Sequence, residues 1–292
     1  MNLLETMVDS NMITAKDYEL YLPKFLIEAK QEMKKQVISE KNKSIEKAQA
    51  DPNWRRNNYD GEEKDYGNNK LSSYATLLMP FWEMNPSVSQ LFQQMLRSND
   101  KRLKYNTAIL LLRHKRPIPD TLLKHFAAQD EFRYELYTDL KEIKQPHLFP
   151  VAYNDHIDLA KSKLLNLNSY ETPDTIAFID KLPLHYKNRS GFVYFFKYRQ
   201  KKDDNGWKIA TAGLIPSHLG VYEFEKKSTV KEEYEYNFTE LTTTKIDEEE
   251  PLKDQLQKVL KKMVYTKRKS GVQFYDEENK YSQFSSFFNF RD

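Results

Sequence analysis

Apolar side chains recur every three or four positions through the first half of the chain, which predicts a series of amphipathic helices. The first begins after Thr14-Ala-Lys-Asp17, which resembles a capping box, and runs toward Ala50. Its apolar positions form one narrow stripe, made of Leu22, Leu26, Ala29, Met33 and Val37. Such a stripe suits a helix that packs on one side only or projects from the body. We therefore expect residues 1–52 to form a long helix or helical arm.

The following segment, residues 53–70, is polar and contains two glycines, which predicts a linker. Beyond it, short apolar-periodic stretches are separated by turns marked by proline or aspartate, with Asn85 and Asp100 as helix caps. Short helices joined by short turns lie antiparallel to their neighbours. Residues 71–170 are therefore predicted to form a helical array, either HEAT-like hairpins or a compact bundle.

The period of the pattern then changes from about 3.6 to 2. Residues 192–199 are rich in β-formers, 201–206 form a turn, and 207–215 form the returning strand. Further strands are expected at 221–225, 233–241 and 272–275, and Pro251 is expected to open a helix with Leu252, Leu256, Val259, Leu260 and Met263 on one face. Residues 171–292 thus predict a mainly antiparallel sheet with a packing helix. The predicted fold class of the whole chain is α+β.

Composition limits the classes of function. The aromatic content of 13% can build a core, and the absence of cysteine excludes disulfides, thiolate metal sites and cysteine nucleophiles. The balance of 46 Lys and Arg against 43 Asp and Glu argues against nucleic acid as a partner of the chain as a whole.

No apolar run approaches the roughly 20 residues that span a bilayer, and the first residues do not form a signal peptide. We expect a cytoplasmic protein if Met1 is the native start, and an envelope or exported one if the chain belongs to a longer precursor.

Catalytic motifs are missing from the sequence. It contains no glycine-rich phosphate loop, no Gly-x-Ser-x-Gly elbow and no histidine pair at metal-binding spacing. Asp155-His156-x-Asp158 brings three ligand types together, but neighbouring side chains on a turn diverge, so a helix cap is favoured over a metal site. We predict no cofactor and no metal.

Three hypotheses for function follow. The first is a non-catalytic scaffold or protein-interaction region, whose partner is another protein or an adjacent domain of a longer chain. The second is small-molecule binding or catalysis in an aromatic pocket of the β domain, lined by Phe192, Tyr194, Phe196, Trp207 and Ile209. The third is binding of a polyanion or nucleic acid through two basic clusters without acids, represented by Arg102, Lys104, Arg113, Lys115, Arg116, Lys261 and Lys262. Solvated helix faces are the favoured interpretation of both clusters, because cations stabilise helix C-termini and segment 223–250 is acidic.

Four runs also suggest a family: MPFWEMNPSV at 79–88, DKRLKYNT at 100–107, GFVYFFKY at 191–198 and WKIATAGLIP at 207–216. Over roughly residues 60–225 they resemble the non-catalytic C-terminal region that follows a TraB/GumN-type domain in some large bacterial proteins. Such domains resemble metal-dependent proteases and carry Gly-x-x-His elements, which do not occur here. The resemblance implies that the enzymatic portion is missing from this chain.

Separately, the DNGWKI turn at 204–209 is similar to hairpins of SnoaL-like cone folds, which implies a ligand pocket lined by aromatics.

Overall fold

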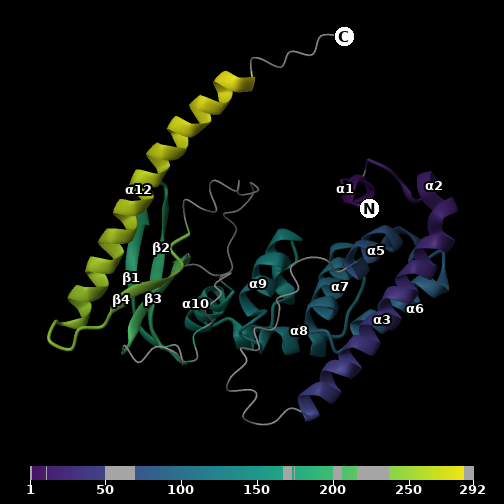
Figure 1. Ribbon diagram of the computed structural model, residues 1–292, viewed down its shortest axis with the longest axis horizontal. Helices are drawn as coiled ribbons and strands as arrows, with labels where there is room; N and C mark the ends of the chain where they lie inside the picture. Colours follow the sequence, from purple (N-terminus) through teal and green to yellow (C-terminus); the bar gives the residue numbers. More distant parts are fainter. Residues whose placement is uncertain are drawn as a thin grey trace. The chain divides into compact units, whose positions relative to one another are not determined.

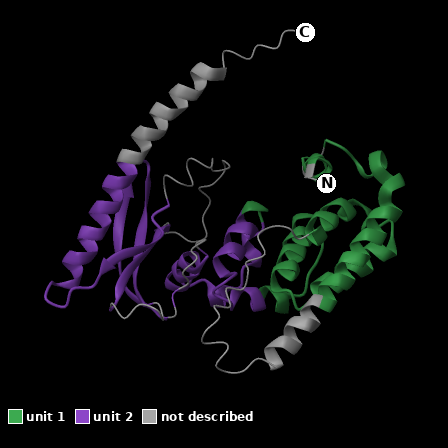
Figure 2. Cartoon of the chain, in the orientation of Figure 1, with its two compact units in different colours: residues 1–123, 142–144 green, residues 124–141, 145–292 purple. Residues whose placement is uncertain are grey.

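The computed structural model describes residues 2–10, 12–49, 70–166, 173, 175–199, 206–215 and 237–285. The predicted strand at 221–225 and nearly all of the predicted linker at 53–70 lie outside the described residues. The chain divides into two compact units, each with its own core (Figure 2). Unit 1 comprises residues 1–123 and 142–144, and unit 2 comprises residues 124–141 and 145–292.

Unit 1 is helical. Its elements are α1 (Asn2–Asp9), α2 (Ala15–Tyr18), the 3-10 turn η1 (Glu19–Tyr21), α3 (Leu22–Gln49), α5 (Lys70–Leu78), the 3-10 turn η2 (Met79–Phe81), α6 (Pro86–Leu96), α7 (Lys101–Arg113) and the start of α8 (Asp120–Ala127). Helix α5 lies at the centre, because α1, α3 and α7 all pack against it. Its apolar face is completely buried, as Leu77 and Leu78 show.

The helix starts in unit 1 follow local signals. Asn85 accepts a hydrogen bond from the amide of Ser87 at 2.9 Å, and Asp100 accepts one from the amide of Leu103 at 2.9 Å, which confirms both predicted caps. The capping box of Thr14 and Asp17 also forms. It opens only one turn of helix, however, because η1 interrupts the helix expected from 14 to 50. Pro23 explains the restart at Leu22, since its missing N–H is tolerated only in the first turn of a helix.

Unit 2 joins helices to a sheet. It contains most of α9 (Arg133–Glu142), the 3-10 turns η3 (Pro146–Leu148) and η4 (Val151–Tyr153), α10 (His156–Leu165), four antiparallel strands in the order β1-β2-β3-β4, and α12 (Leu252–Ser285). The strands are β1 (Thr175–Tyr186), β2 (Arg189–Arg199), β3 (Lys208–Ile215) and β4 (Glu240–Lys245). The predicted α+β class, with helices first and then an antiparallel sheet with a packing helix, is confirmed (Figure 1).

The two faces of the sheet support separate cores. Tyr194 and Phe196 of β2 pack toward α10, whereas Val193 and Phe195 pack toward α12. In the register of β2 and β3, Tyr194 lies opposite Ala212 and Phe196 opposite Ala210, and the small alanines leave room for α10 above the rings. The strict alternation of strand side chains therefore places α10 and α12 on opposite faces of one sheet.

Some local expectations were wrong. Val37 was expected to face inward, but it is 51% exposed, and Leu252 is 39% exposed. The strand expected at 272–275 lies within α12, which continues to Ser285. A single internal glycine, Gly271, disfavours a helix by only about 1 kcal/mol, which is too little to end a helix that contains no proline. The strand expected at 233–241 begins only at Glu240 among the described residues.

A buried arginine connects the helices of unit 2. Arg133 is 5% exposed; its Nε donates to the carbonyl oxygen of Ala127 at 2.7 Å and its Nη2 to that of Ala128 at 3.2 Å. Its Nη1 donates to the carboxylate of Asp130 and, at 3.3 Å, to the carbonyl oxygen of Asp158 on α10. The guanidinium thus supplies a donor to the carbonyl of the buried Ala127 and also bonds those of Ala128 and Asp158.

Candidate functional site

The five residues proposed for an aromatic pocket do not share one face of the sheet. Phe192, Tyr194 and Phe196 lie on the α10 side. Ile209 is fully buried in the core on the α12 side. Trp207 is covered by cations, with Lys197 Nζ 4.8 Å and Arg199 Cζ 4.4 Å from its ring centroid. Since Lys197 lies opposite Ile209 in the register, Trp207 and its cations are also on the α12 side, and the five side chains cannot line one cavity.

One hydrogen-bonded pair lies on the α10 side of the sheet. Nδ1 of His156, the first residue of α10, lies 3.2 Å from the hydroxyl oxygen of Tyr194. Lys181 Nζ lies 4.9 Å from the ring centroid of Phe192 and 5.8 Å from that of Tyr194. Burial and the nearby Lys181 hold the pKa of His156 below its usual value against the opposing effect of Asp155, and burial raises the pKa of Tyr194. At neutral pH the pair is an uncharged imidazole and an uncharged phenol.

The neighbouring Asp155 is a helix cap. Its Oδ1 accepts hydrogen bonds from the amides of Ile157 at 2.8 Å and Asp158 at 3.1 Å, at the start of α10. The cap interpretation of Asp155-His156-x-Asp158 is therefore confirmed. Among the residues that the structure describes, no group of three histidines and acids comes together as a metal site would require.

A lysine with a perturbed pKa joins α10 to the sheet. Lys163 Nζ donates to the carbonyl oxygen of Gly213 at 2.9 Å and lies 5.4 Å from the ring centroid of Tyr134. Burial lowers the pKa of Lys163 to about 8. The same carbonyl accepts hydrogen bonds from the amide of Phe238 at 2.8 Å and from the hydroxyl of Thr239 at 3.0 Å. The amine is thus one of three donors to a backbone carbonyl, which is a structural role. Nothing in the sequence of α10 indicates it.

The basic residues of the first cluster lie at the two ends of α7. Arg102 and Lys104 are in its first turn, and Arg113 is its last residue, roughly 14 Å farther along the axis. Most of the helix between them is buried, as Ala108 is. Arg102 lies over the ring of Tyr105 at 5.6 Å, and Arg116 forms an ion pair with Glu83. Lys115, in the turn after the helix, is exposed. The structure therefore does not bring the five cations of this cluster into one surface.

The remaining predicted cations, Lys261 and Lys262, are exposed on the first half of α12. This half packs on the sheet through Leu256, Val259 and Met263. The two lysines therefore project from the opposite side of the helix.

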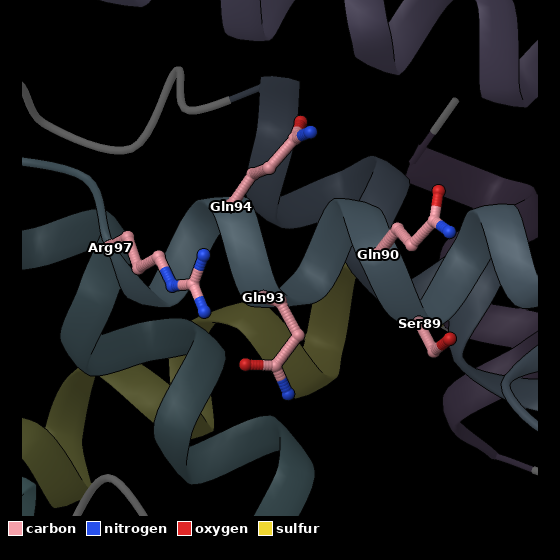
Figure 3. A pocket seen from close by; sticks show the side chains of 5 residues that line it. All are labelled: Ser89, Gln90, Gln93, Gln94 and Arg97. Carbon is pink, nitrogen blue, oxygen red and sulfur yellow. The ribbon is translucent and has the colours of Figure 1, made fainter.

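A shallow hollow lies over the solvent face of α6 (Figure 3). Its volume is about 410 Å³, and the described side chains that line it are Ser89, Gln90, Gln93, Gln94 and Arg97. The first four belong to α6 and Arg97 is its C-cap. Their positions repeat every four residues, opposite the buried Val88, Leu91, Phe92 and Met95. The Ser89 hydroxyl already donates to the carbonyl oxygen of Pro86 at 2.9 Å. The lining offers amides and one guanidinium, which suits polar contacts.

The solvent-facing side of η1 and α3 combines apolar and basic residues. Leu20 is 94% exposed, Ile27 57% and Ile38 59%. We call this surface the outer stripe: Leu20, Lys24, Ile27, Lys30, Lys34 and Ile38, all of which are exposed. Two acidic residues of α3 near this surface are engaged elsewhere: Glu28 accepts a hydrogen bond from the hydroxyl of Tyr74 at 2.8 Å and Glu32 pairs with Lys35 at 2.7 Å. The sequence shows this pattern in the helical spacing of Ile27 and Ile38, beside the buried stripe of Leu26, Ala29 and Met33, which we call the inner stripe.

The chain matches no protein-family model, and no curated protein or solved structure is significantly similar to it. The resemblance to the region that follows TraB/GumN-type domains therefore stays a prediction. Within the described part of the chain, no helix is long and apolar enough to cross a bilayer.

Proposed function

We propose that this chain is a non-catalytic protein-binding module, and that the outer stripe binds an acidic amphipathic helix of a partner protein. The observation that carries this proposal is the exposure of Leu20 on η1 and of Ile27 and Ile38 on α3, away from the buried stripe of α3. Leu26, Ala29 and Met33 hold α3 on unit 1, so the outer stripe is presented on an anchored helix.

The energetics favour burial of this surface by a partner. Covering a leucine or isoleucine side chain contributes about 1.5–3 kcal/mol, so three of them offer several kcal/mol toward association before its entropic cost. Apolar side chains at helical spacing are how amphipathic helices recognise each other. Scattered single apolar residues on a surface need no explanation, but these three follow the solvent-facing side of two consecutive elements, η1 and α3.

Charge decides the kind of partner. Lys24, Lys30 and Lys34 lie beside the three apolar side chains on the same face. A partner helix with leucines at its centre and glutamates or aspartates at its flanks would match both features, whereas a basic partner would be repelled. The catalytic alternative has less support, because its proposed pocket residues are divided between the two opposite faces of the sheet.

The experiment is calorimetric titration of the whole chain with a synthetic helical peptide that carries leucines at steps of three and four, flanked by glutamates. A second peptide with the glutamates replaced by lysines measures the charge preference. Ile27→Glu should weaken binding of the acidic peptide at least tenfold, since it adds a repelling charge and removes an apolar contact. Met84→Glu is the matched control, because Met84 is 61% exposed in the same unit but lies outside the outer stripe.

Two outcomes would overturn the proposal. In the first, both peptides bind equally, or Ile27→Glu and Met84→Glu behave alike. In the second, sedimentation shows that the chain associates with itself and that Ile27→Glu makes it monomeric, which would assign the outer stripe to a second copy of the chain.

A further inference from the structure

The solvent face of the first half of α12 carries a row of cations and one aromatic ring. We call it the basic stripe: Lys258, Lys261, Lys262, Tyr265 and Arg268. Their spacing of three and four residues places them on one side of the helix over roughly 15 Å. The first half of α12 lies along the sheet (Figure 1). Its other side is fixed to the sheet through Leu256, Val259 and Met263, and the Thr211 hydroxyl lies 3.5 Å from Met263 Sδ.

Among the described residues, acidic side chains balance the charge of the basic stripe near Lys258. Lys258 pairs with Glu250, which raises the pKa of this lysine, and Asp254 and Asp247 act in the same direction. No acidic residue occurs between positions 258 and 268. Lys267 is partly buried beside the stripe. Burial lowers the pKa of Lys267, and Glu240 of β4 opposes this effect. Lys261, Lys262 and Arg268 therefore form the positive part of the surface.

The neighbours of these cations favour one class of ligand. The outer stripe of α3 places three aliphatic side chains among its lysines, but the basic stripe exposes no aliphatic side chain, and its apolar contact surface is the ring of Tyr265, 59% exposed. Cations for phosphates and an exposed ring for base stacking are what proteins present to single-stranded nucleic acid. An amphipathic peptide or a membrane surface would require aliphatic contacts that this face lacks.

We propose that the basic stripe of α12 binds single-stranded nucleic acid, with Lys261, Lys262 and Arg268 on phosphates and Tyr265 stacked on a base. This site is independent of the outer stripe, which lies in the other unit. With about three phosphate contacts, the affinity should fall with salt at a logarithmic slope of about −2. The near-neutral net charge of the chain does not oppose this local surface, because exposed charges more than a Debye length apart are largely screened at physiological salt.

The test is fluorescence anisotropy of a labelled twelve-nucleotide oligo-dT, titrated with the whole chain at several salt concentrations. Lys261→Glu combined with Lys262→Glu should weaken binding more than tenfold, and Tyr265→Ala by roughly 5- to 150-fold. Lys253→Glu is the matched control: Lys253 is exposed on the same helix but lies about a third of a turn away from the basic stripe, so this variant should bind within about threefold of the unaltered chain. Circular dichroism of each variant confirms that its helices remain folded.

Each contrary result has a definite meaning. If Lys253→Glu weakens binding as much as the double variant, general charge accounts for the affinity and the stripe is not a site. If Tyr265→Ala binds normally and a heparin fragment or vesicles of anionic lipid compete equally, the surface takes polyanions without stacking, and the proposal is wrong. A duplex of the same sequence that binds more tightly than the single strand would also overturn it.

Discussion

The ammonium group of Lys163 donates a hydrogen bond of 2.9 Å to the carbonyl oxygen of Gly213, so a partly buried lysine ties α10 to β3. Lysine is well suited to this position because its long stem packs along apolar surface while its amine reaches a backbone carbonyl. The location carries an electrostatic cost, since burial lowers the pKa of Lys163 to about 8.

Because of this lowered pKa, the free energy of unfolding should depend on pH in a defined direction. Between pH 8 and 10.5 the unfolded chain keeps its proton on Lys163 while the folded chain loses it, so the unfolded state binds more protons and stability rises with pH. Lys163→Met should remove this rise and should be neutral or stabilising at pH 7. Urea denaturation at pH 7 and pH 9.5 measures both effects. A variant that keeps the full rise between these pH values would show that Lys163 does not cause it.

Arg133 should be a sensitive position of unit 2. Arg133→Met leaves the carbonyls of Ala127 and Ala128 without their donor and leaves Asp130 with only Lys161, so we expect a loss of about 2–4 kcal/mol in the free energy of unfolding. Arg133→Lys should lose an intermediate amount, because an ammonium cannot reproduce the planar fork. Chemical denaturation measures these values, with the exposed Arg113→Met as control. Equal stability of the two methionine variants would contradict the assigned role.

Asp130 should contribute to acid sensitivity. Burial pushes its pKa upward, but the hydrogen bonds from Lys161 and Arg133 outweigh burial, and the pKa lies below its usual value. Such a group stabilises the folded state above its unfolded pKa and loses that contribution as the pH falls through its folded pKa. Asp130→Asn should therefore reduce the slope of stability against pH below about pH 4. Denaturation at pH 3 and pH 6 tests this, and an unchanged slope would count against it.

Tyr18 connects the start of the chain to α5. It is 3% exposed, its hydroxyl donates to the carbonyl oxygen of Leu77 at 2.9 Å, and burial raises its pKa to about 12. Tyr18→Phe should cost about 1 kcal/mol at pH 7, because a carbonyl in the last turn of α5 loses a donor. Between pH 10 and 12 the unfolded tyrosine ionises first, so stability should fall as pH rises, and less steeply in the variant. Thermal unfolding at pH 7 and pH 11 distinguishes this role from a purely steric one, in which Tyr18→Phe would lower the melting temperature equally at both pH values.

The carboxylate of Asp100 connects α7 to α3 in unit 1. It caps α7 through the amide of Leu103 and accepts a hydrogen bond of 2.7 Å from Gln36 Nε2 on α3. Asp100→Ala should cost about 1–2 kcal/mol, whereas Asp100→Asn should cost little, because asparagine is an equally good cap. Chemical denaturation of both variants compares them. If they lose the same amount, the charge of Asp100 matters more than its cap.

The fold could be predicted where its signals are local. The caps at Asn85 and Asp100 depend on one side chain and an amide two or three residues later, and the period-2 pattern of β2 already places Tyr194 and Phe196 on one face. The face on which Ile209 lies depends on the register of β3, which no local pattern shows. Likewise, the carbonyls that Arg133 binds are brought together only by the turn between α8 and α9 and by the approach of α10.

The candidate surfaces were visible in the sequence only in part. Lys261 and Lys262 stood out as a charge cluster, but the exposed ring of Tyr265 on the same face required the orientation of α12. The apolar residues of the outer stripe were present at helical spacing beside the inner stripe. When a helix has two apolar faces, its sequence does not show which face is buried. In α3 the packing against α5 determines which face is buried.

The measurement that tests the central claim most directly is a charge exchange across the outer stripe. In a triple variant, Lys24, Lys30 and Lys34 are each replaced by glutamate, and its affinities for the glutamate-flanked and lysine-flanked peptides are compared with those of the unaltered chain. If the outer stripe binds an acidic amphipathic helix, the unaltered chain prefers the glutamate-flanked peptide and the triple variant prefers the lysine-flanked one. A preference that is absent, or that does not invert in the triple variant, would contradict the account.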